Sequence, residues 1–294
     1  MTSSGFPAVE PWASPSEDAV VRLVRRCLSA DGGLPLAAEP WFVRSRWLRD
    51  DGRAFVVRDG DQVVAAAAVR PGRDGASVVG LVDPGFRERG IGGRLLDTAL
   101  AAARDLGGGV TLESEGVSDG VLGLFAGRGF RQVFAEDVMS FDLAAADFSS
   151  ESGLPERASV VEWGPDVAER FHAVYVDSFR ERPGFPDPSA EEWISETVEE
   201  DDFREDWSLL VSLPGVGDAG FVTATEGWIV QVGVVPSARG RGVGAALIRE
   251  SLRRASASGM RESWLCVNVD NPASELYRRI GFRDRGRRGR FQEV

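Results

Sequence analysis

The stretch VVPSARGRGVGAALIRESLRRA, residues 234–255, gathers arginines and glycines where a predicted strand ends and a predicted helix begins. Glycine lets a backbone approach a ligand closely, and the first turn of a helix offers unpaired N–H groups with a partial positive charge. Together these features predict an anion site, most naturally a site for a phosphate group.

The same pattern occurs earlier in the chain. Residues 82–107 align with residues 234–259 without a gap. In the same register, FAGRGFR from Phe125 aligns with YRRIGFR from Tyr277. Two copies of one domain are therefore predicted, spanning 1–148 and 157–294. The small, polar run from Ala144 to Ser159 is predicted to hold the seam between them.

Each copy is predicted to be an α/β domain in which helices precede a hairpin and a strand leads into the glycine loop. In the second copy the predicted elements are helices over 166–179 and 190–200, a hairpin over 207–225, a buried strand over 228–235, and a helix from the loop to Arg254. A strand over 263–269 and a helix over 272–280 follow. The tail after residue 280 is predicted to supply the last strands of the same copy.

Composition narrows the function classes. The net charge of −12 argues against a nucleic-acid partner, and no apolar run reaches membrane length. The N-terminus has neither the basic flank nor the apolar core of a signal peptide, so we expect a cytoplasmic monomer or homodimer. The chain has no lysine, which excludes a lysine Schiff base, and no metal site is predicted. Cys27 and Cys266 are expected to be buried free thiols.

A dinucleotide site is the first alternative for the loop, since Gly240, Gly242 and Ala245 match the spacing G-x-G-x-x-[GA]. That fingerprint should open the first βαβ unit, whereas several predicted elements precede this loop. The repeat does not preserve it either, because Glu88 stands in the place of Gly240.

The pattern that both copies keep, V-x-P-x-x-R-x-R-G-x-G, resembles the acyl-CoA loop of the GNAT superfamily of N-acyltransferases. The resemblance implies two tandem GNAT-type domains, each a mixed, mostly antiparallel sheet flanked by helices, with acetyl-CoA as acyl donor. It implies that the pyrophosphate is held by Arg239, Gly240, Arg241, Gly242, Val243 and Gly244, and in the first copy by Arg87, Arg89, Gly90 and Gly92.

The second copy also carries VNVDNPASELYRRIGF, which resembles the family's second signature. By that resemblance Asn271 touches the pantetheine arm, the backbone from Val232 to Val234 pairs with the pantetheine amides, and Tyr277 is the general acid. The implied reaction is direct transfer of an acetyl group to the primary amine of a small molecule.

The proton acceptor is less well specified. The family places an acid or a histidine on the central strand at the position of Trp228, which cannot accept a proton. Glu226, two residues earlier, is the candidate base, and a solvated glutamate at a strand end is the alternative. His172 is expected to be a packing residue of a helix rather than a base.

The first copy lacks the acid, because Phe125 and Asp119 replace Tyr277 and Asn271. Its role is predicted to be non-catalytic. A non-catalytic first copy beside a catalytic second copy resembles the mycothiol synthases, a tandem group within the family. A drug- or metabolite-modifying acetyltransferase is a further alternative. A different class, a non-catalytic acyl-CoA-binding regulator, also stays open.

Overall fold

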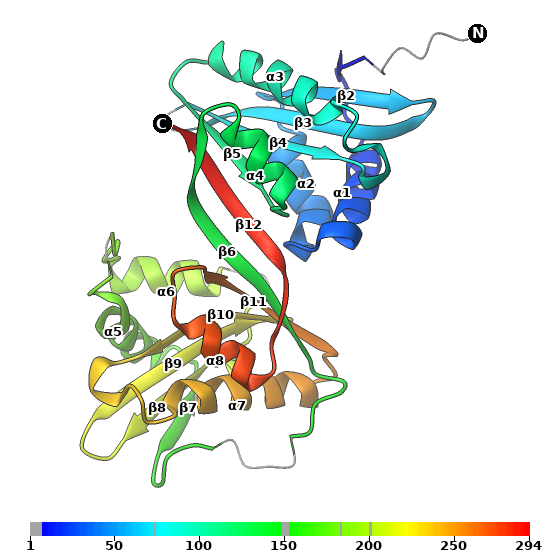
Figure 1. Cartoon of the computed structure of the whole chain (residues 1–294). Coiled ribbons are helices and arrows are strands. Elements are labelled where there is room, and N and C mark those ends of the chain that lie inside the picture. The colour runs from blue at the N-terminus through cyan, green and yellow to red at the C-terminus, as the bar shows by residue number, and fades with distance from the viewer. Residues whose placement is uncertain (1–7, 73–74, 149–152, 183, 200–201) are drawn as a thin grey trace. The chain divides into compact units, whose positions relative to one another are not determined.

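The structure is a computed structural model that describes residues 8–72, 75–148, 153–182, 184–199 and 202–294 (Figure 1). Residues 149–152 of the predicted seam and residues 1–7 of the N-terminus lie outside this set. Among the described residues, every helix is too short or too polar to cross a membrane.

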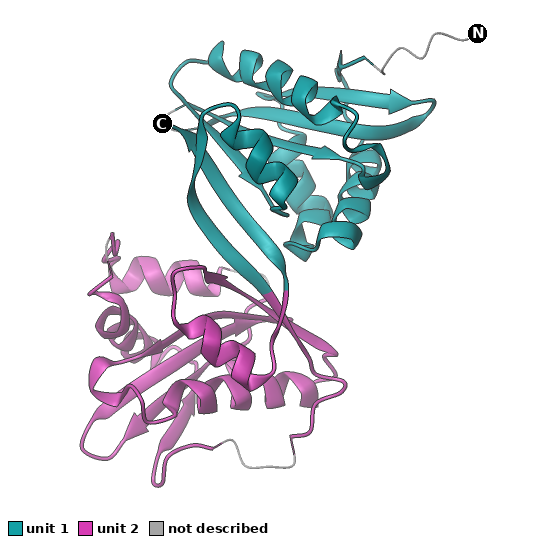
Figure 2. Cartoon of the chain, in the orientation of Figure 1, with its two compact units in different colours: residues 1–138, 285–294 teal, residues 139–284 magenta. Residues whose placement is uncertain are grey.

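The chain divides into two compact units (Figure 2). Unit 1 comprises Met1–Val138 and Arg285–Val294, and unit 2 comprises Met139–Asp284. This division differs from the predicted boundaries of 1–148 and 157–294 at both ends of unit 2. The last ten residues, in particular, belong to the first unit and not to the second.

Unit 1 is a mixed sheet with strand order β1-β2-β3-β4-β5-β12-β6, in which β4 and β5 are parallel. Its strands are β1 (Glu10–Pro11), β2 (Arg53–Asp59), β3 (Gln62–Gly72), β4 (Gly75–Val82), β5 (Gly109–Ser114), β12 (Arg283–Glu293) and the first part of β6 (Phe130–Asp142). Its helices are α1 (Glu17–Asp31), η1 (Pro35–Ala38), α2 (Pro40–Trp47), η2 (Pro84–Phe86), α3 (Ile91–Arg104) and α4 (Asp119–Ala126).

Unit 2 repeats this plan with strand order β6-β11-β10-β9-β8-β7, in which β10 and β11 are parallel. Its strands are β7 (Ser159–Glu162), β8 (Leu209–Leu213), β9 (Gly217–Thr225), β10 (Trp228–Val234), β11 (Glu262–Asn268) and the end of β6. Its helices are α5 (Ala168–Phe179), α6 (Ala190–Val198), η3 (Glu205–Trp207), η4 (Pro236–Ala238), α7 (Val243–Ala257) and α8 (Ala273–Ile280). The helices and strands of unit 2 follow the predicted order as far as α8, whereas the tail strand β12 does not complete this unit.

The two faces of the unit 2 sheet are covered by different helices. On one face, the α5 residue Phe171 and the α6 residue Trp193 pack against Phe221 of β9, with ring centroids 6.3 and 5.9 Å from it. On the other face, Val243 and Leu247 of α7 lie against Gly220, where a Cβ atom would approach their side chains within 2.9 and 3.1 Å. The central strands β9 and β10 are held between these layers.

The last strand is exchanged between the repeats, so the prediction that the tail after residue 280 supplies the last strands of the second copy is wrong. β6 and β12 occupy equivalent places in the repeat. Yet β12 lies between β5 and β6, pairing from Gly289 opposite Ser114 to Gln292 opposite Thr111, while β6 lies beside β11 (Figure 1). The two strands differ in composition, since β6 (FRQVFAEDVMSFD) is largely apolar and β12 (RDRGRRGRFQE) is rich in arginine, and neither local pattern specifies which sheet the strand completes.

Phe291 of β12 anchors the exchange. Its side chain is only 2% exposed in the core of unit 1, and its ring meets Phe125 edge-on at 4.9 Å. The C-terminal residues are therefore part of the first unit's core, and the first copy cannot complete its sheet from its own segment of chain.

We expect Phe291→Ala to lower the free energy of unfolding by about 3–5 kcal/mol, because a buried aromatic side chain is removed from unit 1. Urea unfolding followed by tryptophan fluorescence measures the change. Val294→Ala is the control, since Val294 is 79% exposed and its truncation should cost less than about 0.5 kcal/mol. Equal effects of the two substitutions would contradict the exchange of β12.

Candidate active site

The arginine–glycine loop of unit 2 connects β10 to α7, as the sequence predicts. Gly240 and Gly242 have φ angles of 75° and 80°, which glycine adopts without steric cost. A Cβ atom on either would have no neighbour within 4 Å among the described residues. Gly242 is the N-cap of α7, so the N–H groups of the first helical turn have no partner within the helix. The loop therefore presents backbone donors to open space, the geometry of a phosphate site.

The side chain of Arg239 connects this loop to neighbouring elements by hydrogen bonds. Its Nε donates to the carbonyl of Val234 at 3.2 Å and its Nη2 donates to the carbonyl of Ser178 at 3.0 Å. The guanidinium therefore ties the loop to the end of β10 and to α5. The remaining predicted loop residues differ in exposure: Arg241 is exposed, Val243 is buried, and Gly244 is half-buried.

The strands that precede and follow the loop separate almost at once. β10 and β11 are in register only at Trp228 and Trp264, and a bulge in the β9–β10 pairing falls between Ile229 and Gln231. Beyond Trp228 the edge of β10 that faces β11 is not paired with it. The predicted contact segment Val232–Val234 lies on this open edge, and for that reason β10 is only partly buried rather than a fully buried strand.

Asn271 lies two residues before α8, and Tyr277 lies in the middle of that helix. The Asn271 side-chain carbonyl accepts a hydrogen bond from the N–H of Ala273 at 3.0 Å, which begins the helix. Tyr277 is half-buried and meets Phe282 edge-on at 5.9 Å. Burial raises the pKa of Tyr277, and the charge of Arg182 opposes this rise only in part. The phenol therefore keeps its proton at neutral pH and can donate it.

Glu226 does not lie beside the segment of β10 that is predicted to contact the pantetheine arm. It is exposed in the turn between β9 and β10, where its N–H donates to the carbonyl of Asp202 at 2.8 Å. Val232 is about six residues further along the strand, roughly 20 Å at ~3.3 Å per residue. The structure does not bring Glu226 to the segment predicted to hold the thioester, so its role as base stays a prediction that the geometry does not favour.

Unit 1 reproduces the loop. Gly90 has a φ angle of 73° at the N-cap of α3, and Glu88 has a φ angle of 60° where the second copy has Gly240. Arg87 donates to the carbonyl of Val82 and pairs with Asp31 at 2.6 Å, so its guanidinium also braces the loop. A non-glycine residue in the left-handed region costs roughly 1–2 kcal/mol, so packing and the ion pair impose this backbone shape despite the local strain.

The other predicted loop residues of unit 1 have structural neighbours. The guanidinium of Arg89 lies over the ring of Phe86 at 5.0 Å. A Cβ atom on Gly92 would lie 3.6 Å from the side chains of Leu124 and Val82.

A cavity of about 500 Å³ lies beside the unit 1 loop. Its walls include Val82, Arg87, Gly90, Leu124 and Phe125, so the counterpart of Tyr277 faces this cavity with an apolar ring.

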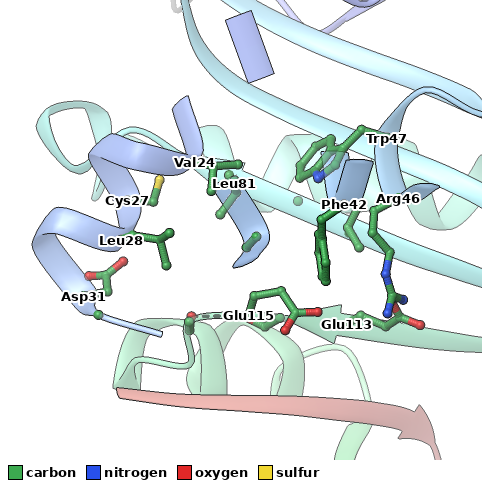
Figure 3. Close-up of a pocket in the computed structure, with 16 residues that line it drawn as sticks. Val24, Cys27, Leu28, Asp31, Phe42, Arg46, Trp47, Leu81, Glu113 and Glu115 are labelled. Atoms are coloured by element: carbon green, nitrogen blue, oxygen red, sulfur yellow. Dashed lines mark hydrogen bonds and ion pairs between the residues drawn. The ribbon is translucent and has the colours of Figure 1, made fainter. Parts of the chain in front are cut away.

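A second, smaller cavity of about 40 Å³ lies between α1, α2 and β5 (Figure 3). There Arg46 and Glu113 form an ion pair, while Cys27 and Trp47 contribute apolar wall. Burial alone would raise the pKa of Glu113, but its ion pairs with Arg70 and Arg46 lower it. This carboxylate therefore stays ionised and has a structural role.

His172, Cys27 and Cys266 are the remaining side chains that were considered for a catalytic role, and each is buried or half-buried. Nε2 of His172 lies 3.0 Å from the carbonyl of Pro188 and the ring packs against Tyr175 and Trp193, which confirms a packing role. Cys27 is buried and burial raises the pKa of its thiol to about 11, whereas Cys266 is only half-buried.

Sequence reading missed the polar residues that face the α5–α6 side of the sheet, chiefly Thr223 and Gln231. Thr223 and Thr225 alternate with apolar residues along β9, whereas Gln231 stands among apolar residues of β10, so only β9 carries a signal in the sequence.

The residues present fit acetyl-CoA. The open glycine loop suits a pyrophosphate, the unpaired edge of β10 suits the amides of an extended arm, and Tyr277 suits a departing thiolate.

We expect Gly242→Val to weaken acetyl-CoA binding by about tenfold or more, because valine at this φ angle is strained and its bulk fills the space above the loop. Calorimetric titration with acetyl-CoA measures the change. Gly259→Ala is the control, since Gly259 also has a positive φ angle of 91° but lies beyond the end of α7. Unchanged affinity in Gly242→Val would contradict the assignment of the loop.

Known proteins share this organisation. A sequence model of the Acetyltransferase (GNAT) family matches residues 18–130 and again residues 171–282. The chain is 30% identical to a mycothiol acetyltransferase of Clavibacter michiganensis, covering 80% of this chain and 78% of that protein. It is 31% identical to a mycothiol acetyltransferase of Actinosynnema mirum, covering 90% and 91%.

Solved structures are similar over nearly the whole chain. A GCN5-related N-acetyltransferase from Sphaerobacter thermophilus superposes with a TM-score of 0.73 at 27% identity, covering 98% of this chain and 96% of that one. A tandem GNAT protein from the clavulanic acid pathway superposes with a TM-score of 0.60 at 20% identity, covering 97% of each chain, and supports the fold alone. The two loops, the two separated strand pairs and these matches together place the chain in the GNAT family of acetyltransferases, as a tandem-domain member that uses acetyl-CoA.

Proposed function

We propose that unit 2 transfers the acetyl group of acetyl-CoA to the primary amine of a small molecule. The observation that carries the assignment to unit 2 is the pair Tyr277 and Phe125. They occupy equivalent places in the repeat, but only Tyr277 has a proton to donate, and its environment keeps that proton in place. Unit 1 keeps the loop and has a cavity beside it without this acid.

In the proposed reaction the neutral amine attacks the thioester carbonyl directly. The new C–N bond forms as the C–S bond breaks, and the departing thiolate takes the proton of the Tyr277 hydroxyl. The N-protonated amide then loses its extra proton to solvent, and the Tyr277 phenolate regains a proton from solvent. We propose that backbone N–H groups of β10 near Val232, beyond the last paired residue Trp228, stabilise the developing oxyanion. No acyl-enzyme is required, so the half-buried Cys266 has no catalytic role.

For unit 1 we propose an acyl-CoA-binding role without turnover. The αL conformation at Glu88 and Gly90 keeps the shape of the second loop, and the adjacent cavity is large. The predicted contacts are those of Arg87, Arg89, Gly90 and Gly92.

A second candidate for the acceptor comes from the relatives. Both curated relatives above are named mycothiol acetyltransferases and align along most of the chain, which favours their acceptor as a candidate for unit 2. The tryptophan at position 228, where an acidic residue is expected in that group, speaks against it.

Tyr277→Phe should lower kcat by roughly 10² to 10⁴, the usual contribution of a general acid, and leave acetyl-CoA affinity nearly unchanged. Thiol release from acetyl-CoA in the presence of a panel of primary amines measures kcat. The matched control is Gly92→Val in unit 1, which should leave kcat intact. Turnover that survives Tyr277→Phe and disappears in Gly92→Val would place the active site in unit 1.

The pH profile gives an independent test. A raised pKa moves loss of the protonated phenol to higher pH, so kcat should not fall on the alkaline side until the pH exceeds about 10, the ordinary pKa of tyrosine. Measuring kcat from pH 7 to 11 tests this. An alkaline decline centred well below 10 would show that another group donates the proton.

A further inference from the structure

The cavity of about 500 Å³ beside the unit 1 loop has walls that are mostly apolar. Its charged lining residues, Asp31, Arg87 and Glu88, gather at the loop, where Arg87 pairs with Asp31 at 2.6 Å. The wall also includes five half-buried apolar side chains: Leu81, Val82, Val121, Leu124 and Phe125. These side chains keep part of their surface accessible, so a ligand in the cavity can contact them directly.

A pair of small residues widens this cavity. Gly80 of β4 pairs with Ala67 of β3, and both line the cavity. At the equivalent place in unit 2, Val232 of β10 pairs with Val222 of β9. Gly80 and Val232 precede their loops by the same number of residues. Val222 is fully buried in the core of unit 2 and Val232 packs against that core, so two branched side chains occupy the position that unit 1 leaves open.

The backbone at Gly80 does not require a glycine. A Cβ atom there would lie 3.7 Å from the carbonyl oxygen of Ala66 and 3.7 Å from the Cβ of Ala67, which are ordinary van der Waals distances. The φ angle of Gly80 is not positive either. Neither backbone strain nor a steric conflict therefore accounts for the missing side chain, and the space in front of Gly80 is available to a ligand.

The size and the chemistry of the cavity indicate which ligand fills it. At about 30 Å³ for a water-sized group, 500 Å³ holds roughly 16 non-hydrogen atoms, and the part of a pantetheine arm nearest the thiol uses about half of them. The remaining space has apolar walls, and the ring of Phe125 stands there in place of the general acid. Such a space suits a hydrocarbon chain and not a reacting amine.

We propose that unit 1 binds an acyl-CoA whose acyl chain is several carbons longer than acetyl, with the chain lying between Gly80 and the side chains of α4. The inference rests on the proposed acyl-CoA-binding role of unit 1 and names the class of ligand for that role. The two units then hold different thioesters. Unit 2 takes acetyl-CoA as its substrate, and unit 1 retains a medium-chain acyl-CoA without turnover.

The test compares hexanoyl-CoA with acetyl-CoA, which differ only in the length of the acyl chain. Calorimetric titrations use the full-length Gly242→Val protein, in which the loop of unit 2 is disabled, so that the signal reports unit 1. Burying one CH2 group strengthens binding by up to about fourfold, so hexanoyl-CoA should bind at least about tenfold more tightly than acetyl-CoA. Equal affinities would overturn the inference.

Gly80→Val, added to the same protein, restores the side chain that unit 2 has at the equivalent position. It should bring the ratio of the two affinities close to one, while acetyl-CoA still binds because the loop is unchanged. Gly123→Val is the matched control, since Gly123 lies on α4 outside the cavity wall and a Cβ there would have no neighbour within 4 Å among the described residues. The control should leave the ratio unchanged. A ratio that also survives Gly80→Val would show that the chain lies elsewhere.

Val121→Thr provides a second variant in case Gly80→Val does not fold. It keeps the shape of the side chain on the α4 wall and adds a hydroxyl group, which opposes burial of a hydrocarbon chain. The ratio of the two affinities should fall by a few-fold. An unchanged ratio in Val121→Thr would contradict the placement of the chain against α4.

The two proposals for unit 1 fail in different ways. If neither acyl-CoA binds to the Gly242→Val protein, unit 1 has no acyl-CoA site, and its proposed role falls together with the inference. If both bind with equal affinity, and Gly92→Val in the same protein weakens both, unit 1 binds acyl-CoA as proposed. Only the inference about the length of the chain is then overturned.

Discussion

The separation of β10 from β11 is the constraint on which the site of unit 2 depends. Parallel strands normally continue their hydrogen-bond ladder, but here the register ends at Trp228 and Trp264. The bulge after Ile229 turns β10 away, leaves Val232–Val234 with an open edge, and aligns Gln231 with Thr223. The open edge and the alignment of Gln231 with Thr223 therefore follow from one local interruption of pairing, whereas the glycine loop does not, because unit 1 forms the same loop without a bulge between β3 and β4.

In the first unit the two parallel strands stay paired over a longer stretch. There β4 and β5 remain in register from Gly75 to Val79 before they separate, so the opening begins later along the strand. The loop backbone is nevertheless the same, with Glu88 held at a positive φ angle. The two units share a loop conformation and differ in the residues around it, chiefly Tyr277 against Phe125. Two domains with the same loop backbone and different surrounding side chains can both bind the same class of ligand while only one of them catalyses a reaction.

The exchange of β12 makes the two repeats dependent on each other for folding. Phe291 completes the core of unit 1 although it is encoded after the whole of unit 2. Contacts between residues so distant in sequence carry a large loop-closure cost, so unit 1 is expected to finish folding only after the C-terminus is available. The same link leaves the elements of the candidate site in unit 2, from β10 to α8, within one continuous segment of chain.

Sequence alone determined the repeat, the helices and strands, and the loop, because each is encoded by local patterns of apolar spacing, glycine and proline. The resemblance of VNVDNPASELYRRIGF to the family's second signature also singled out Asn271 and Tyr277 as candidate site residues. Tertiary structure decided which sheet β12 completes, because the pairing of strands far apart in the chain is not encoded in the local pattern of either strand. It also placed Glu226 in an exposed turn and grouped Trp193, Thr223 and Gln231 around one cavity, since register and helix packing, unlike local pattern, set which distant side chains meet.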